Sequence, residues 1–552
     1  MIKNFTICLL LVLSSCPVIF GQSPWYHHTT IYQIYPRSFY DSNGDGIGDI
    51  PGIIQKLDYI KSLGYETIWC SPFFASPQKD FGYDVSDYRQ IAPEYGTLAD
   101  AERLIAEVHQ RDMKILFDMV MNHTSDEHPW FAEDRHRKPE ERGARRDYYV
   151  WTDQPNNWKS MVSGNAWRYD TIRQQYYYAA FLPFQPDLNY RNAKVKEAML
   201  DHVRFWLRKG VDGFRLDIFN SIYEDDSLRN NPTSGNIESH MQRPVYTANR
   251  PESLQFAEEL RAVCDSFGER MLLGEIIGDR SVSRKYCGDK INNRLTLAFD
   301  FEMLRFQFSA KYFAKLVSNL ENDFPEPFMP AYVFSNHDRR RSMKRLNNDE
   351  SKAKLLHLMQ LTLRGVPCMY YGEDVGMTDA KLPYKTALDP IPHYVKLPRG
   401  IVNMVDETLN RDELRTPMQW SADKNAGFST AEKTWLPVNS DYKNVNVANA
   451  SASDSSLLLL IKQTLALRNK TKALSHGALK LISAEQLPAH VLAYKRTWGN
   501  EKVVVVLNFG KREVEMSVPG TFSKVEVSNS KGNKLSGEKL TLAGWGGVVL
   551  AR

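Results

Sequence analysis

Eight short apolar runs alternate with amphipathic segments between residue 30 and about residue 470, and this alternation constrains the fold most. Such a pattern is typical of a parallel sheet whose strands are connected by helices. Because eight such strands favour closure on themselves, we predict an α/β fold built on a (β/α)8 TIM barrel. The runs span residues 31–35, 67–71, 115–119, 213–217, 271–275, 295–299, 331–335 and 367–371.

Helix signals lie between these runs. Thr97 and Asp100 have the spacing of a capping box and precede an apolar stripe at helical period. A similar stripe begins at Ile53. Further helices are expected within residues 195–207, 254–264, 352–363 and 457–467.

Two regions depart from the alternation and predict additional units. The connection after the third run is much longer than an ordinary loop and indicates an inserted subdomain. After about residue 475, alternating strands replace the helical period and indicate a C-terminal antiparallel β-sandwich. The predicted organisation is a signal peptide (1–22), a first barrel part (23–123), an inserted subdomain B (124–190), a second barrel part (191–474) and the C-terminal domain (475–552).

The first 22 residues have the pattern of an export signal, with Lys3 before an apolar run at 7–13. Cleavage near Gly21 predicts a soluble secreted protein. Residues 13–16 also resemble a bacterial lipobox, which would leave a lipid anchor on Cys16. The expected location is therefore secreted, periplasmic or on the cell envelope. No later apolar run approaches the roughly 20 residues that span a bilayer, so no transmembrane segment is expected.

Charge and cysteine content exclude some classes of function. The formal net charge is only +4, so nucleic acid is not an expected partner. No pair of cysteines has the CxxC spacing of a zinc site. Cys70 and Cys368 lie in strand-like runs and are predicted to be free buried thiols. For Cys264 and Cys287, a disulfide and two free thiols both remain open. The oligomeric state is also open.

Acidic residues close several of the apolar runs. The fourth run ends at Asp217 and the fifth at Glu275, while Asp338 follows the seventh. In a parallel barrel the active site lies at the carboxyl ends of the strands, so these carboxylates are expected to converge. Asp118, in the third run, is interpreted as supporting structure.

The neighbours of two carboxylates suggest different roles for them. Arg215 lies two residues before Asp217 on a strand and points to the same face, where it keeps that carboxylate ionised, as a nucleophile requires. Glu275 has no adjacent cation in the sequence and is interpreted as the protonated acid. Two carboxyl groups about 5 Å apart would give the retaining route of glycoside hydrolysis.

The strand ends resemble, in order, the characteristic regions of the α-amylase superfamily, glycoside hydrolase family 13. The matching stretches are residues 118–123, 213–217, the segment around Glu275 and residues 336–338. The resemblance implies that Asp217 is the nucleophile and Glu275 the general acid/base. It also implies that Asp338 is a third catalytic carboxylate, which binds sugar hydroxyls.

Within that superfamily the chain is similar to the oligo-1,6-glucosidase and α-glucosidase group. The similarity lies in Gln-Pro-Asp-Leu-Asn at 185–189 and Arg-Thr-Pro-Met-Gln-Trp at 415–420. It implies a retaining, exo-acting α-glucosidase whose small-molecule substrate is a disaccharide or short oligosaccharide of the maltose, isomaltose or sucrose type.

The same resemblance assigns substrate-binding roles. It implies that Asp80 and Arg415 together clamp the non-reducing glucose and that Tyr83 offers the sugar a stacking face. His123 and His337 would form hydrogen bonds with its hydroxyls. Arg215 would complete the substrate-binding set beside the nucleophile.

Several alternatives remain open. Ile218 follows the nucleophile where the family usually has a small residue, which leaves the preferred linkage undecided. A sucrose-specific hydrolase, a transglucosidase and an isomerase would use the same machinery. A non-catalytic sugar-binding or transporter-accessory module is the alternative from another class.

A second site is predicted in the glycine-rich turn at 41–49. Oxygen-bearing residues lie there at alternate positions, as in calcium-binding loops, although a plain acidic turn is a rival reading. The resemblance favours a structural Ca2+ and adds a backbone carbonyl as ligand. No catalytic cofactor is expected. The predicted ligands are Asp41, Asn43, Asp45, Ile47 (through its carbonyl) and Asp49.

Overall fold

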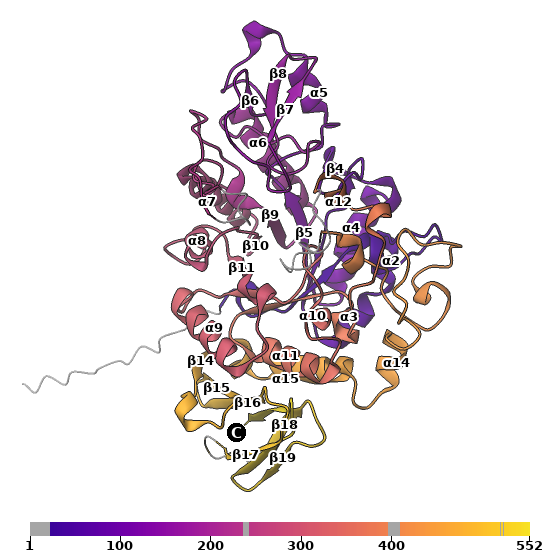
Figure 1. Ribbon diagram of the computed structural model, residues 1–552, viewed down its shortest axis with the longest axis vertical. Coiled ribbons are helices and arrows are strands. Elements are labelled where there is room, and N and C mark those ends of the chain that lie inside the picture. The colour runs from indigo at the N-terminus through magenta and orange to yellow at the C-terminus, as the bar shows by residue number, and fades with distance from the viewer. Residues whose placement is uncertain are drawn as a thin grey trace, which may run out of the picture.

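The structure is a computed structural model that describes residues 23–235, 242–395, 409–518, 520, 522 and 524–551. Eight parallel strands close into a barrel in the order β1-β13-β12-β11-β10-β9-β5-β2, which confirms the predicted fold (Figure 1). These strands overlap all eight predicted runs. They are β1 (Ile31–Ile34), β2 (Thr67–Cys70), β5 (Lys114–Val120), β9 (Gly213–Asp217), β10 (Met271–Gly274), β11 (Leu297–Asp300), β12 (Ala331–Val333) and β13 (Val366–Tyr370). The predicted signal peptide and Cys16 lie outside the described residues.

Helices connect the strands. The predicted capping box is confirmed at α4 (Leu98–Gln110), where the Thr97 hydroxyl accepts from the Asp100 amide at 3.2 Å and the Asp100 carboxylate accepts from the Thr97 amide at 3.0 Å. Other connecting helices are α3 (Leu57–Leu63), α6 (Ala193–Arg208), α7 (Pro251–Asp265), α8 (Arg280–Tyr286), α9 (Ala310–Asp323), α11 (Glu350–Thr362) and α15 (Leu457–Lys470). Shorter helices are α1 (Pro36–Phe39), α2 (Ile50–Gln55), α5 (Pro129–Arg135), α10 (Ser342–Arg345), α12 (Ile391–Tyr394), α14 (Val447–Ala452) and α16 (Lys472–Ser475).

Side chains fill the barrel interior. One apolar cluster takes alternate residues of the strands, such as Met271 and Leu273 of β10, together with Ile31 and Leu116. Because strand side chains alternate in direction, these positions share the inner face, while their neighbours pack outward against the helices. The packed interior leaves the strand ends as the place where polar side chains gather.

Small antiparallel sheets lie outside the barrel. Strands β6 (Trp151–Thr152), β8 (Gln175–Tyr178) and β7 (Trp167–Asp170) form one sheet between β5 and α6, within the stretch predicted as the inserted subdomain. A two-stranded sheet pairs β3 (Phe74–Ala75) with β4 (Asp87–Ile91). In Figure 1 the β6-β8-β7 sheet lies at one end of the molecule and the C-terminal sheets lie at the opposite end.

The C-terminal part is antiparallel, as predicted. One sheet has the order β14-β15-β16-β21-β18 and the other β17-β20-β19. Arg496 of β15 is fully buried and donates to the carbonyl of Thr362 at 2.7 Å, which joins this part to α11. The strands are β14 (Ala478–Leu481), β15 (Val491–Trp498), β16 (Glu501–Asn508), β17 (Val514–Ser517), β18 (Lys524–Ser528), β19 (Lys534–Ser536), β20 (Lys539–Leu542) and β21 (Gly547–Ala551).

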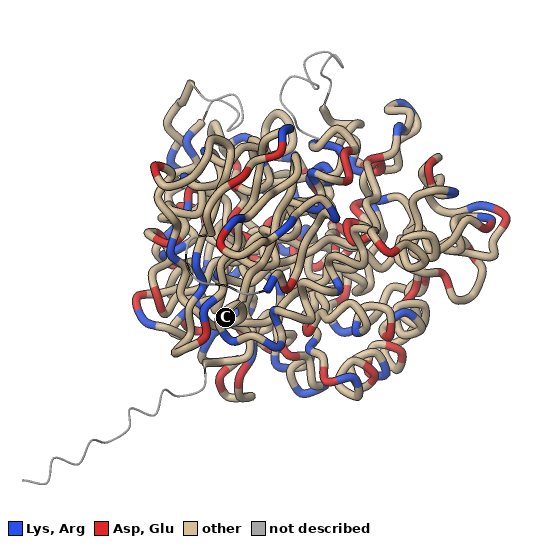
Figure 2. The backbone as a smooth tube through the Cα atoms, turned by 90° about the horizontal axis from the view of Figure 1, so that it is seen from below, with Lys and Arg blue, Asp and Glu red and all other residues tan. Residues whose placement is uncertain are grey.

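Charge and cysteine positions complete the description. Basic and acidic residues are interspersed along the chain (Figure 2). Cys70 and Cys368 are free buried thiols, as predicted, and Cys264 and Cys287 are also free, so no disulfide joins them. Over the described ranges, every helix is too short or too polar to cross a bilayer.

Candidate active site

Arg215 of β9 joins three carboxylates. Its Nη1 donates to Asp217 at 2.7 Å and to both oxygens of Asp118 at 2.8 and 2.9 Å, and its Nη2 donates to Glu275. Asp118 pairs directly with Arg215 in the β5–β9 register, so the barrel itself brings them together. One buried guanidinium therefore holds the ends of β5, β9 and β10 in a single cluster.

The contact between Arg215 and Glu275 corrects one interpretation of the sequence. Glu275 does have an adjacent cation, because β10 lies beside β9 and Leu273 pairs with Arg215. Burial nevertheless raises the pKa of Glu275 to about 8, with Arg215 opposing the shift. Burial also raises the pKa of Asp217, again against Arg215. The pKa of Asp217 is raised to about 7, so the higher value belongs to Glu275, and the assignment of Glu275 as the acid stays a prediction.

Asp338 follows β12 and has a different electrostatic environment. Its Oδ1 accepts from Arg411 and from Arg415, each at 3.0 Å, and its Oδ2 lies 3.1 Å from Nε2 of His337. The amide oxygen of Asn336 accepts from the Asp338 backbone amide at 3.0 Å. Burial opposes ionisation of Asp338, but the hydrogen bond from His337 and the charges of Arg411 and Arg415 hold its pKa well below the usual value. Asp338 is therefore ionised.

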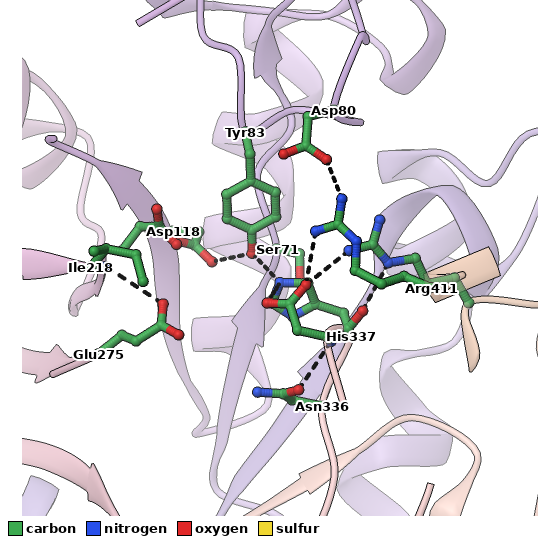
Figure 3. Close-up of polar contacts among 12 residues, drawn as sticks. Ser71, Asp80, Tyr83, Asp118, Ile218, Glu275, Asn336, His337 and Arg411 are labelled. Atoms are coloured by element: carbon green, nitrogen blue, oxygen red, sulfur yellow. Dashed lines mark hydrogen bonds and ion pairs between the residues drawn. The ribbon is translucent and has the colours of Figure 1, made fainter. Parts of the chain in front are cut away.

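Arg411, not Arg415, makes the ion pair with Asp80. The Nη2 of Arg411 lies 2.6 Å from Asp80 Oδ1, whereas Arg415 donates to Asp338 and, through Nε at 2.8 Å, to the carbonyl of His337. Asp80 and Arg415 both lie at the site, joined through Arg411 and Asp338, and their predicted role as a glucose clamp stays a prediction. Figure 3 shows Arg411 reaching toward Asp80. Asp389 fixes Arg411 through a further ion pair of 2.8 Å.

The sequence contained a signal for Arg411. The short helical turn Arg411–Leu414 places Arg411 and Arg415 one turn apart, so both can face one carboxylate. Motif resemblance identified only the second arginine.

Tyr83 connects the two halves of the site (Figure 3). Its hydroxyl donates to Asp118 at 3.1 Å and lies 2.7 Å from Nε2 of His337. The rings of Tyr83 and His337 are stacked, with centroids 5.1 Å apart and planes inclined by 8°. The two rings thus lie nearly parallel and meet through their polar edges, and the contact of Tyr83 with a sugar stays a prediction.

His123 is buried and held by protein groups. Its Nδ1 lies 2.9 Å from the amide oxygen of Asn122, and its Nε2 lies 3.0 Å from the carbonyl of Tyr83. Burial lowers its pKa to about 4, so the ring is neutral. His123 thus supports the backbone of Tyr83, and its hydrogen bond to a sugar stays a prediction.

Two further residues shape the site. Asp84 accepts hydrogen bonds from the amides of Lys79 and Asp80, each at 3.0 Å, and so holds the turn that carries Asp80. Ile218, directly after Asp217, has a left-handed backbone with φ 40° and ψ 42°. A β-branched residue is strained in that region, at a cost of about 1–3 kcal/mol. The strained residue therefore lies beside Asp217 and Glu275, the two residues predicted to carry the chemistry.

The predicted calcium loop has successive Asx turns. The side chains of Asp41, Asn43 and Asp45 accept from the amides two residues on, at 3.1, 2.9 and 2.8 Å. This repeat presents oxygens at alternate positions, as calcium-binding loops do. Asp49 instead caps α2 by accepting from Gly52 at 2.6 Å. Across the described residues, no group of three or more His, Cys, Asp or Glu side chains is arranged to hold a metal ion, so the calcium ion stays a prediction.

Comparisons with known proteins agree with this geometry. The model of the α-amylase catalytic domain matches residues 33–477, and that of the C-terminal domain of the α-amylase SusG matches residues 491–549. A probable α-glucosidase of Rhizobium meliloti is 36% identical, with 95% of this chain and 96% of the relative covered. An oligo-1,6-glucosidase of Parageobacillus thermoglucosidasius is also 36% identical, with 90% and 92% covered.

Solved structures are similar over nearly the whole chain. An α-glucosyl transfer enzyme superposes with a TM-score of 0.87 at 36% identity, covering 96% of this chain and all of the other. Isomaltulose synthase from Klebsiella sp. LX3 superposes with a TM-score of 0.85 at 32% identity, with 96% and 100% covered. The site, the fold and these similarities lead to one conclusion: the chain belongs to the α-amylase family of glycoside hydrolases, family 13, and is an enzyme with α-glucosidase-type homologues.

Proposed function

We propose that this protein is a retaining, exo-acting α-glucosidase that removes terminal non-reducing glucose from disaccharides and short oligosaccharides. The observation that carries the proposal is the position of Arg215, which donates from one side chain to both Asp217 and Glu275. A shared cation places a nucleophile and an acid beside each other at one barrel mouth. The homologues named α-glucosidase and oligo-1,6-glucosidase support the same reaction class.

The first half of the reaction forms a covalent intermediate. The carboxylate of Asp217 attacks the anomeric carbon, while Glu275 gives its proton to the glycosidic oxygen and the leaving sugar departs. The ionised Asp338 binds hydroxyls of the glucose and favours its distortion toward the transition state.

The second half uses water. Glu275, now a carboxylate, takes a proton from a water molecule, whose oxygen attacks the anomeric carbon and displaces Asp217. Two inversions at one carbon release glucose with the α configuration. The pKa of Glu275, raised by burial to about 8, suits a group that must alternate between acid and base near neutral pH.

We propose that the linked pair of Asp80 and Arg411 forms the closed end of the glucose pocket. Both are buried, and Arg411 also contacts Asp338, so the pair lies beside the predicted sugar-binding carboxylate. A charged pair fixed at this point supports binding of the terminal glucose and hence exo-action.

Glucosyl transfer or sucrose isomerisation is a second candidate. It is favoured by solved relatives named as an α-glucosyl transfer enzyme and as isomaltulose and trehalulose synthases, at 30–36% identity. These reactions share the covalent intermediate and differ in whether a sugar hydroxyl or water attacks it.

We also propose export through the signal at 1–22 and a structural Ca2+ at the loop 41–49. The successive Asx turns support the calcium site. N-terminal sequencing of the mature protein tests export. A chain that starts at Met1 in the culture medium or envelope fraction would contradict cleavage.

The function is tested by supplying maltose, isomaltose, sucrose, trehalose, nigerose and soluble starch to the purified protein. The expected result is release of α-glucose from one or two short sugars, with starch left intact. New disaccharides from sucrose would support the second candidate. If no sugar is turned over but sugar is bound, the non-catalytic module would be the better account.

A further inference from the structure

Gln33 lies outside the predicted site but contacts it through His337. It lies in β1, is fully buried, and its Nε2 is 2.8 Å from Nδ1 of His337. The strand β1 pairs with β2 on one side and β13 on the other, so its backbone is fixed in the barrel wall. The same Nε2 donates to the hydroxyl of Ser71 at 3.3 Å.

The contacts of His337 determine where its proton lies. Nε2 is 3.1 Å from a carboxylate oxygen of Asp338, and an ionised carboxylate only accepts hydrogen bonds. Nε2 must therefore carry hydrogen. Burial lowers the pKa of His337 to about 4, so the ring is neutral and Nδ1 holds a lone pair. Only a donor satisfies that lone pair, and the amide nitrogen of Gln33 is in place to donate.

The orientation of the Gln33 amide follows from the same argument. With the amide reversed, Gln33 Oε1 would face the Nδ1 lone pair. In the orientation found, Oε1 is buried and finds no partner among the residues described. A buried acceptor without a partner costs about 1–3 kcal/mol. The orientation found therefore favours the donor contact with His337 over a partner for Oε1.

A continuous chain of hydrogen bonds runs from Gln33 into the carboxylate cluster. Gln33 donates to His337, and His337 Nε2 faces both Asp338 and the hydroxyl of Tyr83. Tyr83 in turn donates to Asp118, which accepts from Arg215. Because carboxylates only accept and Arg215 only donates, His337 is the member of this chain whose tautomer can change, and Gln33 contacts it there.

We propose that Gln33 is a positioning residue that fixes the Nε2–H tautomer of His337 and so holds Asp338 in its working orientation; this rests on the proposed function. Gln33 touches neither the reacting atoms nor the nucleophile, and it acts through His337. Removing the outer partner that fixes a metal-bound histidine costs about 10- to 100-fold, and a loss of that size is expected here.

The test starts from two variants of similar length. Gln33→Met removes the donor, so His337 can take the Nδ1–H form with its Nε2 lone pair against Asp338. We expect kcat to fall about 10- to 100-fold with little change in KM. Gln33→Glu offers an acceptor, which supports a doubly protonated His337 at low pH. Its activity should recover as pH is lowered, whereas that of Gln33→Met should not.

Control variants separate positioning from folding. Ser71→Ala removes the other partner of Gln33 and should keep wild-type kcat while Tm falls, because one buried N–H of Gln33 loses its acceptor. The double variant Gln33→Met/His337→Gln should lose no more than His337→Gln alone, because Gln33 acts only through that ring. Wild-type kcat in Gln33→Met, or losses that multiply in the double variant, would overturn the proposal.

A readout that is independent of turnover distinguishes this proposal from the proposed function. Protein labelled with 15N-histidine, with His337→Gln used for assignment, reports the tautomer directly by NMR. An unprotonated Nδ1 in wild type that becomes protonated in Gln33→Met supports the proposal even if no sugar is cleaved. A protonated Nδ1 in wild type would contradict it, whatever the enzyme hydrolyses.

Discussion

The guanidinium of Arg411 donates to Asp338 at 3.0 Å while its other terminal nitrogen lies 2.6 Å from Asp80. Arg411 thus links Asp80 to Asp338, the carboxylate that follows β12. Arg415 approaches the same Asp338 oxygen without pairing with Asp80. The two arginines therefore have separable roles, although they lie only one turn apart.

Removal of the Arg411 side chain should impair substrate binding and leave buried charges unpaired. In Arg411→Ala, Asp80 and Asp389 lose their cation, and breaking a buried pair costs about 3–5 kcal/mol. We expect kcat/KM to fall at least about 100-fold and Tm to drop. Steady-state kinetics and thermal melts measure both. The matched variant Asp80→Asn/Arg411→Met should melt closer to wild type, and equal Tm values for the two variants would contradict the pairing.

The pH dependence should report Glu275. Its pKa is raised by burial to about 8, and the acid step requires the protonated form, so kcat/KM should fall as pH rises through about 8. Glu275→Gln cannot lose that proton and should show low activity with no such alkaline limb. Substrates with a good leaving group should recover the first step in this variant. An alkaline limb of the same midpoint in Glu275→Gln would assign it to another group.

A second buried carboxyl group should limit stability at high pH. Glu224 is buried, its Oε1 is unpartnered in the part of the chain that is described, and burial raises its pKa to about 8. Asp187 nearby has its pKa raised by burial and then by Glu224. A carboxyl group whose pKa is raised on folding contributes stability that is fully present below its pKa in the unfolded chain. This stability is lost as pH rises through its pKa in the folded chain.

Glu224→Gln should therefore melt higher than wild type at pH 9, with a smaller difference at pH 6. The exposed Glu140→Gln serves as the control and should leave Tm unchanged at both values. If the Tm difference between Glu224→Gln and wild type is the same at pH 6 and pH 9, titration of Glu224 does not limit stability.

Calcium removal should lower thermal stability through the loop at 41–49. Its Asx turns order three of the predicted ligands, and a bound ion would add to their stability because it binds the folded state. We expect Tm to fall in a chelator and to recover with calcium, while Asp45→Ala abolishes the recovery. An identical melting curve with and without chelator would reject the calcium site.

Periodicity and capping patterns predicted the fold because they are local. The alternation of apolar runs located all eight barrel strands, and Thr97 with Asp100 located a helix start. The strand-end carboxylates were also predictable, since a parallel barrel gathers its carboxyl ends at one mouth. These inferences needed only the spacing of residues along the chain.

Contacts between distant segments could not be read in the same way. The cation beside Glu275 comes from a neighbouring strand, and the partner of Asp80 comes from a loop more than three hundred residues later. Gln33 of β1 reaches His337, which follows β12, past the intervening strand β13. Each of these depends on strand adjacency and side-chain reach, which motif spacing does not encode.

The most direct test of the account is to trap and locate the glucosyl intermediate. A fluorinated α-glucosyl substrate that slows breakdown of the intermediate is incubated with the enzyme, and the digested protein is examined by mass spectrometry. One hexosyl adduct is expected on the peptide that contains Asp217. It should be absent from Asp217→Asn, which should be folded and nearly inactive. An adduct on another residue, or near-wild-type turnover by Asp217→Asn, would contradict the account.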